Sequence, residues 1–231
     1  MKFIGLSDDS SAAPPPPLPV AMLGVGAGLA TVCAAGFSVW AYQLIRAEIP
    51  QYAVIALIIV GLGGWVTGRI AVRRGAPWSF PACFAIGFLA YAALWSVAWF
   101  ALRRHMPGAD FVGSVAGLAA LAVVWHAAFG RMRGLGVSVL VLLALHSAGY
   151  YAGGRLHVMV EGPAGKLLWG VMYGLGLGAG MGCVLWGLQV PRAGAATRAT
   201  VALRGNYQPT EATNVRYAAR LDALTNEQDV P

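Results

Sequence analysis

Two histidines, His146 and His126, stand inside long apolar segments of the sequence. An ionisable side chain within a membrane-spanning segment is by default a functional hypothesis. His146 comes about 11 residues after the start of its segment, ~16 Å along a helix that rises about 1.5 Å per residue. Tyr150 follows one helical turn later, between Gly149 and Gly153. These residues suggest a cofactor site for a haem, a quinone or a pigment, whereas a neutral histidine that hydrogen-bonds between two helices is the simpler interpretation.

A pair of histidines on neighbouring helices suggests a haem b held between two axial ligands. His126, however, lies about four residues from the end of its segment, so the two rings would differ by ~10 Å in depth. Because axial ligands face each other across one iron, this difference disfavours a haem with both histidines, and haem b stays possible with another partner. The three cysteines lie singly in different apolar segments without a metal-ligand spacing, so we expect no metal site.

The sequence offers few candidate residues for coupled ion transport or for intramembrane proteolysis. Coupled ion transport normally uses a carboxylate or basic relay within the membrane, and no Asp, Glu or Lys lies inside an apolar segment. An intramembrane serine protease needs a serine and a histidine at matching depth. Ser138 and Ser114 are the candidates to pair with His146, but Ser138 lies too near the start of its segment and neither serine stands in a recognisable nucleophile loop. We therefore predict no catalytic residue, and a small passive channel or a lipid-handling protein remains an alternative.

The composition identifies the elements that hold these residues. The sequence is 58% hydrophobic and only 11% charged, whereas a soluble domain carries about 25% charged residues. Its apolar stretches are continuous and do not alternate, which favours helices over a barrel. We expect an all-α integral membrane protein, a bundle of six transmembrane helices at about 20–45, 51–72, 80–102, 111–129, 135–154 and 167–188.

The sixth segment, Leu167–Leu188, holds no charged residue and is rich in glycine. Small residues spaced four apart let two membrane helices approach closely. Here Gly170, Gly174, Gly178 and Gly182 form one stripe, and Gly176 and Gly180 form a second on roughly the opposite side. We therefore expect a central sixth helix with close neighbours on both sides, and Gly149 and Gly153 as a further close-contact face.

The two ends of the chain differ from the rest. Residues 1–19 are a Pro-rich extension, and 190–231 are a polar tail in which 213–224 predict a short amphipathic helix. With both termini in the cytoplasm, nine Lys or Arg residues near the spans lie inside and five outside, as the positive-inside rule favours. Residues 52–75 resemble helices of many bacterial membrane proteins, so we expect a bacterial inner membrane.

The leading functional hypothesis is a non-catalytic accessory or scaffold subunit of a larger membrane complex. It depends on the absence of charge within the spans, the glycine stripes, the aromatic third span and the two tails. We expect membrane lipids and other subunits, or a second copy of the chain, as partners. The basic residues lie in small groups at helix ends rather than on one face, which argues against nucleic-acid binding.

Overall fold

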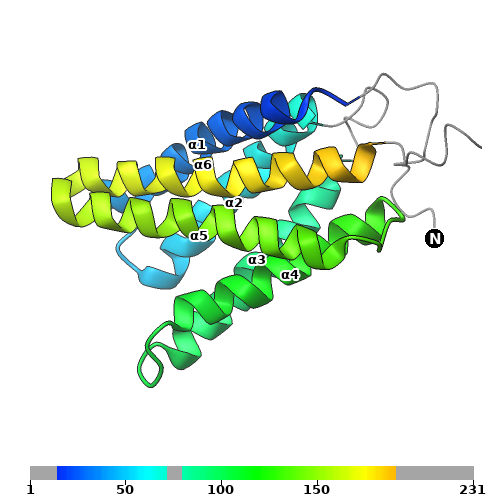
Figure 1. Ribbon diagram of the computed structural model, residues 1–231. Helices are drawn as coiled ribbons and strands as arrows, with labels where there is room; N and C mark the ends of the chain where they lie inside the picture. The colour runs from blue at the N-terminus through cyan, green and yellow to red at the C-terminus, as the bar shows by residue number, and fades with distance from the viewer. Residues whose placement is uncertain (1–14, 72–79, 191–231) are drawn as a thin grey trace, which may run out of the picture. The chain divides into compact units, whose positions relative to one another are not determined.

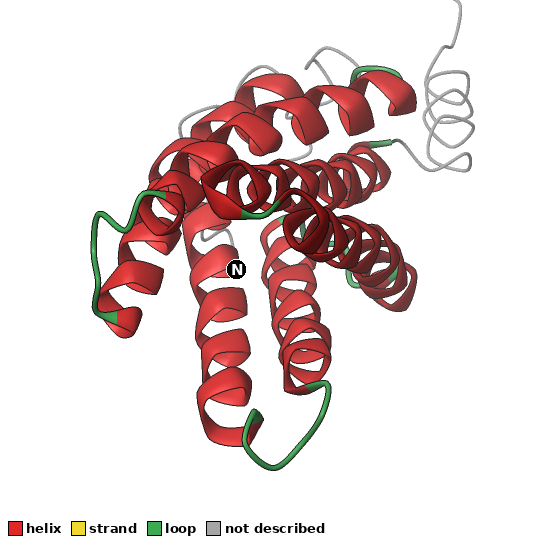
Figure 2. Cartoon of the chain, turned by 90° about the vertical axis from the view of Figure 1, so that its left-hand side faces the viewer, coloured by secondary structure: helices red, strands yellow, loops and turns green. Residues whose placement is uncertain are grey.

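The computed structural model describes residues 15–71 and 80–190, and all regular structure in these ranges is helical (Figure 2). Each helix is long and apolar enough to cross a membrane. The described part of the chain therefore confirms an all-α membrane protein with six spans. The helices are α1 (Leu18–Ala41), α2 (Glu48–Ala71), α3 (Phe80–Leu102), α4 (Ala109–Ala128), α5 (Leu135–Val160) and α6 (Gly162–Gln189).

Several helix ends differ from the sequence-based boundaries. Helix α1 begins at Leu18, with Pro19 in its first turn, because a proline is tolerated where the backbone N–H has no partner within the helix. The predicted extension 1–19 falls mostly outside the described residues, since these begin at 15. The polar tail and its predicted helix at 213–224 also lie outside them.

The largest difference lies between α5 and α6. The charged stretch from Arg155 to Lys166 suggests a loop, yet α5 continues to Val160 and α6 starts at Gly162. The turn is confined to Glu161 and Gly162, whose φ angles are 54° and 61°. Long basic side chains at the end of a span can reach the polar interface, so Arg155 does not end the helix.

The helices pack in a ring that follows their order in the chain. Each helix contacts the next one, and α6 packs most extensively against α1 and α5, between which it lies (Figure 1). Helix α6 also has the largest buried share of the six described helices. The Gly-rich sixth helix therefore has close neighbours on two sides, as the sequence predicts.

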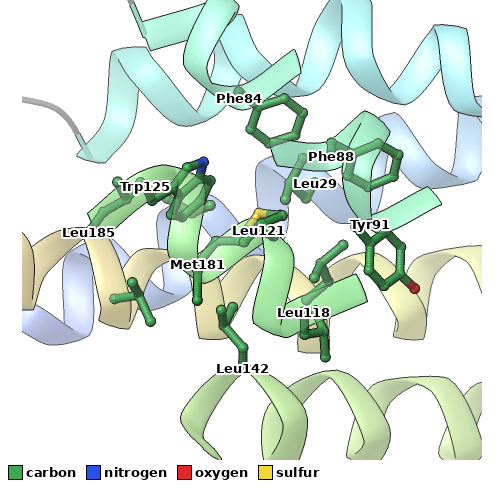
Figure 3. Close-up of a cluster of buried hydrophobic side chains, with 14 of the residues drawn as sticks. Leu29, Phe84, Phe88, Tyr91, Leu118, Leu121, Trp125, Leu142, Met181 and Leu185 are labelled. Carbon is green, nitrogen blue, oxygen red and sulfur yellow. The ribbon is translucent and has the colours of Figure 1, made fainter. Parts of the chain in front are cut away.

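The core is built mainly from α1, α3, α4 and α6 and includes an aromatic row on α3. Figure 3 shows Phe84, Phe88 and Tyr91 along this row, with Trp125 from α4 packed on Phe84 at 6.4 Å between ring centroids. Trp125 is fully buried. Trp125 lies near the end of its span, where tryptophans are often found facing the headgroups, but its ring packs against Phe80 and Phe84 of α3 inside the bundle.

Candidate functional site

His146 lies at the centre of a buried polar group that joins three helices. Its Nε2 is 3.0 Å from the hydroxyl of Tyr91 on α3, and the hydroxyls of Tyr91 and Tyr173 on α6 are hydrogen-bonded to each other at 3.3 Å. His146 is only 1% exposed, and its Nδ1 has no hydrogen-bond partner among the described residues. The Tyr150 ring stacks on the imidazole, 5.8 Å away and 14° from parallel. The structure thus brings His146 and Tyr150 together.

A cavity of about 680 Å³ lies against this group, lined by Tyr91, Tyr150 and Tyr173 among others. Its other walls come from α1, α2, α3 and α6, and about half of the lining residues are aromatic. Ligand pockets in proteins typically measure about 300–1,000 Å³ and are mostly apolar with a few polar groups. The aromatic lining residues are Phe37, Trp40, Tyr52, Phe88, Tyr91, Trp95, Trp99, Phe100, Tyr150, Trp169 and Tyr173.

The cavity belongs to one half of the bundle. Its residues come from the end of α1, the first half of α2, α3 from Phe88 onward, Tyr150 in the second half of α5, and the first half of α6. Because consecutive helices run in opposite directions, these parts lie at the same end, where 42–47 and 103–108 connect the helices. The cavity therefore reaches from mid-membrane depth at Tyr91 toward one polar surface.

At this polar end of the cavity, basic side chains lie over aromatic residues of the lining. Arg103 Nη1 lies 2.8 Å from Glu48 Oε1, which links the end of α3 to the start of α2. The guanidinium of Arg103 also stands 5.2 Å from the ring centroid of Phe100. Across the rim, Lys166 Nζ is 4.7 Å from the ring centroid of Trp40. The polar end of the cavity is thus framed by cations over aromatic rings.

His126 takes part in a separate group near the turn between α4 and α5. Its Nδ1 contacts the carbonyl oxygen of Arg131, and its Nε2 lies 2.9 Å from the hydroxyl of Ser138. Because a carbonyl only accepts, Nδ1 carries the proton and Nε2 accepts from Ser138. Both nitrogens are therefore engaged, and the structure does not bring His126 to His146.

The four glycines of the first stripe on α6 all face α1. A Cβ at Gly178 would lie 2.6 Å from the carbonyl oxygen of Val25, and one at Gly174 would meet the backbone of Leu29 and Ala30. Atoms of α1 are likewise within 3.0 Å of a Cβ at either end of the stripe. No side chain fits at these positions without moving α1. The stripe comprises Gly170, Gly174, Gly178 and Gly182.

The second pair on α6, Gly176 and Gly180, faces α5. A Cβ at Gly176 would lie 2.9 Å from the Cα of Gly149, and one at Gly180 would lie 3.3 Å from Leu142. Gly153 meets α6 one turn further on, where its Cβ would lie 3.0 Å from the Cα of Trp169. The predicted packing glycines of α5 and α6 thus lie in the α1–α6 and α5–α6 interfaces.

Sequence reasoning selects His146 and Tyr150 but misses Tyr91 and Tyr173. A signal for them exists, because a tyrosine in the middle of an apolar span needs a partner for its hydroxyl. The pairing itself spans 55 residues for Tyr91 with His146 and cannot be read from local spacing. Ser138 is likewise missed as the partner of His126, although the two lie on either side of a short turn.

Comparisons with known proteins do not add to this site. No family model matches the sequence, and searches among curated proteins and among solved structures found no match. The functional argument therefore depends on the geometry of the cavity and its wall.

Proposed function

We propose that the protein binds a hydrophobic, ring-bearing small molecule from the membrane in the aromatic cavity. The observation that carries this proposal is the cavity of about 680 Å³ with Tyr91 and Tyr173 in its wall, the two tyrosines whose hydroxyls connect it to His146 behind them. Flat rings pack well against aromatic side chains in stacked or edge-on contacts. Tyrosine hydroxyls in an apolar wall provide the few polar contacts that orient such a ligand.

A quinone or pigment fits this wall better than a haem. Each axial ligand must offer a free imidazole nitrogen to the iron, and His146 has only Nδ1 without a partner, since its Nε2 is bonded to Tyr91. His126 is bonded through both nitrogens. The residues present thus do not fit haem b between these two histidines, whereas a ligand that hydrogen-bonds to Tyr91 or Tyr173 leaves the group intact.

Two experiments test whether the cavity binds a molecule: extraction of bound small molecules, and a substitution that fills the cavity. The protein is purified in a mild detergent, and its bound small molecules are extracted and identified by mass spectrometry. Ala92 lines the cavity, so Ala92→Trp fills it and is expected to abolish the bound molecule. Ala82 is an exposed residue on the same helix, so Ala82→Trp is the matched control and keeps it. Equal occupancy in both variants, or none in the parent protein, would overturn the proposal.

The same purification tests the accessory-subunit hypothesis. Stoichiometric foreign chains that remain after detergent exchange would make this chain a subunit, whose contacts would use its lipid-facing surfaces. The glycines on α6 support close packing within the chain, since they face α1 and α5, and so provide no argument for a partner. A single chain with a bound small molecule would favour the ligand-binding function alone.

We also propose that the protein lies in a bacterial inner membrane with both termini in the cytoplasm. In this orientation the polar end of the cavity faces the extracytoplasmic side. The excess of Lys and Arg near one side of the spans supports this orientation. A fluorescent protein fused to the C-terminus is expected to fold and emit, whereas a periplasmic phosphatase fused there is expected to stay inactive. An active phosphatase fusion would reverse the orientation.

A further inference from the structure

The two buried histidines differ in how their protons are fixed. The position of the proton on an imidazole ring follows from the hydrogen bonds that its two nitrogens make. In His126 the carbonyl of Arg131 fixes the proton on Nδ1. In His146 the partner of Nε2 is the Tyr91 hydroxyl, which can donate or accept. Nδ1 of His146 has no partner in the described chain, so neither nitrogen fixes the proton.

The hydrogen bonds from His146 to the cavity wall can therefore run in either of two directions. In the inward direction, Tyr173 donates to Tyr91 and Tyr91 donates to Nε2, so the proton of His146 stands on Nδ1. In the outward direction, Nε2–H donates to Tyr91, Tyr91 donates to Tyr173, and the Tyr173 hydroxyl is free to donate to an occupant. Both arrangements contain the same three protons and the same net charge.

The direction determines which ligand group the wall accepts. The inward arrangement leaves lone pairs on the Tyr173 oxygen and so suits a ligand hydroxyl. The outward arrangement presents a donor and so suits a ligand carbonyl. A buried polar group that lacks its partner costs about 1–3 kcal/mol, so a fixed wall would reject one of the two ligand forms. This wall can match both.

We propose that the chain Tyr173–Tyr91–His146 lets the cavity bind both the carbonyl and the hydroxyl form of one ring, as in a quinone and its hydroquinone, and that the tautomer of His146 reports which form is bound. This inference rests on the proposed function, since it needs an occupant in the cavity. It concerns recognition alone and involves no transfer of electrons by the protein. The ligand class that it names is a lipid-soluble quinone with its reduced form.

The test uses histidine labelled with ¹⁵N in the purified, full-length protein. The chain has four histidines, whose signals are assigned by replacing them one at a time. The probes are decyl-benzoquinone and decyl-benzohydroquinone, kept under argon so that they do not interconvert. Binding is followed by quenching of tryptophan fluorescence, and the tautomer by the ¹⁵N chemical shifts of the imidazole rings.

We expect both probes to bind with affinities within about tenfold, and His146 to carry its proton on Nε2 with the quinone and on Nδ1 with the hydroquinone. His126 is the internal control, because its fixed tautomer should not respond. Binding of both probes with one unchanged His146 tautomer would overturn this inference and leave the proposed function standing. If neither probe quenches the fluorescence, this inference is overturned, whereas the proposed function is decided separately by the extraction experiment with Ala92→Trp.

The Tyr173→Phe variant tests whether the tautomer of His146 responds to the bound probe through the Tyr173 hydroxyl. Removing this hydroxyl cuts the chain at the cavity wall, so the tautomer of His146 should no longer depend on the probe. Loss of one hydrogen bond is expected to weaken quinone binding roughly tenfold. Ser138→Ala, which alters only the partner of His126, should leave both the response and the affinity unchanged. A Tyr173→Phe protein whose His146 still follows the probe would contradict the proposed chain.

Discussion

The hydroxyl of Tyr91 lies 3.0 Å from Nε2 of His146 and connects α3 to α5. These two helices are not neighbours in the ring, because α4 packs between them. The bond therefore crosses the interior of the bundle, and Tyr173 extends it to α6. Such a bond stabilises the relative position of three helices and at the same time forms the polar part of the cavity wall.

Tyr91→Phe tests the contribution of this bond to stability. The change leaves Nε2 of His146 buried without its partner. Measured hydrogen bonds between membrane helices average about 0.6 kcal/mol, with a maximum near 1.7, so we expect a loss of about 1 kcal/mol in the free energy of unfolding. Reversible unfolding in mixed micelles measures it.

The double variant Tyr91→Phe/His146→Phe distinguishes the bond from a general packing effect. If the bond accounts for the loss, the double variant is less destabilised than the sum of the single variants, since removing both partners leaves no unpaired nitrogen. Strict additivity would show that Tyr91 acts only through its ring, and the assigned hydrogen bond would then carry no measurable energy.

Gly174→Ala tests the contact between α6 and α1. A Cβ there would meet the backbone of Leu29 and Ala30, with the Cα of Ala30 at 2.6 Å, and backbone cannot turn away as a side chain can. We expect a loss of about 1–3 kcal/mol from overpacking, measured by the same unfolding assay. Gly187 on the same helix has nothing within 4 Å of its Cβ position, so Gly187→Ala is the matched control. An equal effect of both changes would mean that the stripe does not limit the approach of α1.

The spans could be predicted from the sequence because each is a continuous apolar run, and α3 has the predicted bounds of 80–102. The boundary between α5 and α6 could not, because charge at a helix end indicates the membrane surface rather than the end of the helix. His146 stands out as an ionisable residue in an apolar span. Its partner Tyr91 does not, because the periodicity of one helix carries no information about a residue 55 positions away.

Ser138→Ala tests whether the second histidine has a local role. Ser138 donates to Nε2 of His126 across the turn from α4 to α5, at 2.9 Å. Its loss leaves one buried nitrogen without a partner, so we expect a loss of about 1 kcal/mol with normal occupancy of the cavity. Hydrogen exchange of the amides around 129–138 should increase. A loss of the bound molecule would instead connect this turn to the cavity.

Glu48→Gln tests the ion pair at the polar end of the cavity. The hydrogen bonds that the Arg103 guanidinium donates to the Glu48 carboxylate raise the pKa of Arg103, and a guanidinium is charged throughout the physiological pH range. Removing the carboxylate charge should lower the thermal midpoint at low ionic strength and have little effect at 1 M salt, because exposed charges are screened. Glu161 lies in the connection between α5 and α6 at the same end and forms no ion pair with a described residue, so Glu161→Gln is the control without this salt dependence. The exchanged pair Glu48→Arg/Arg103→Glu should recover the thermal midpoint at low salt. If the Glu48→Gln change instead shifts the midpoint equally at low and high salt, Glu48 acts by packing at the start of α2 and not by its charge.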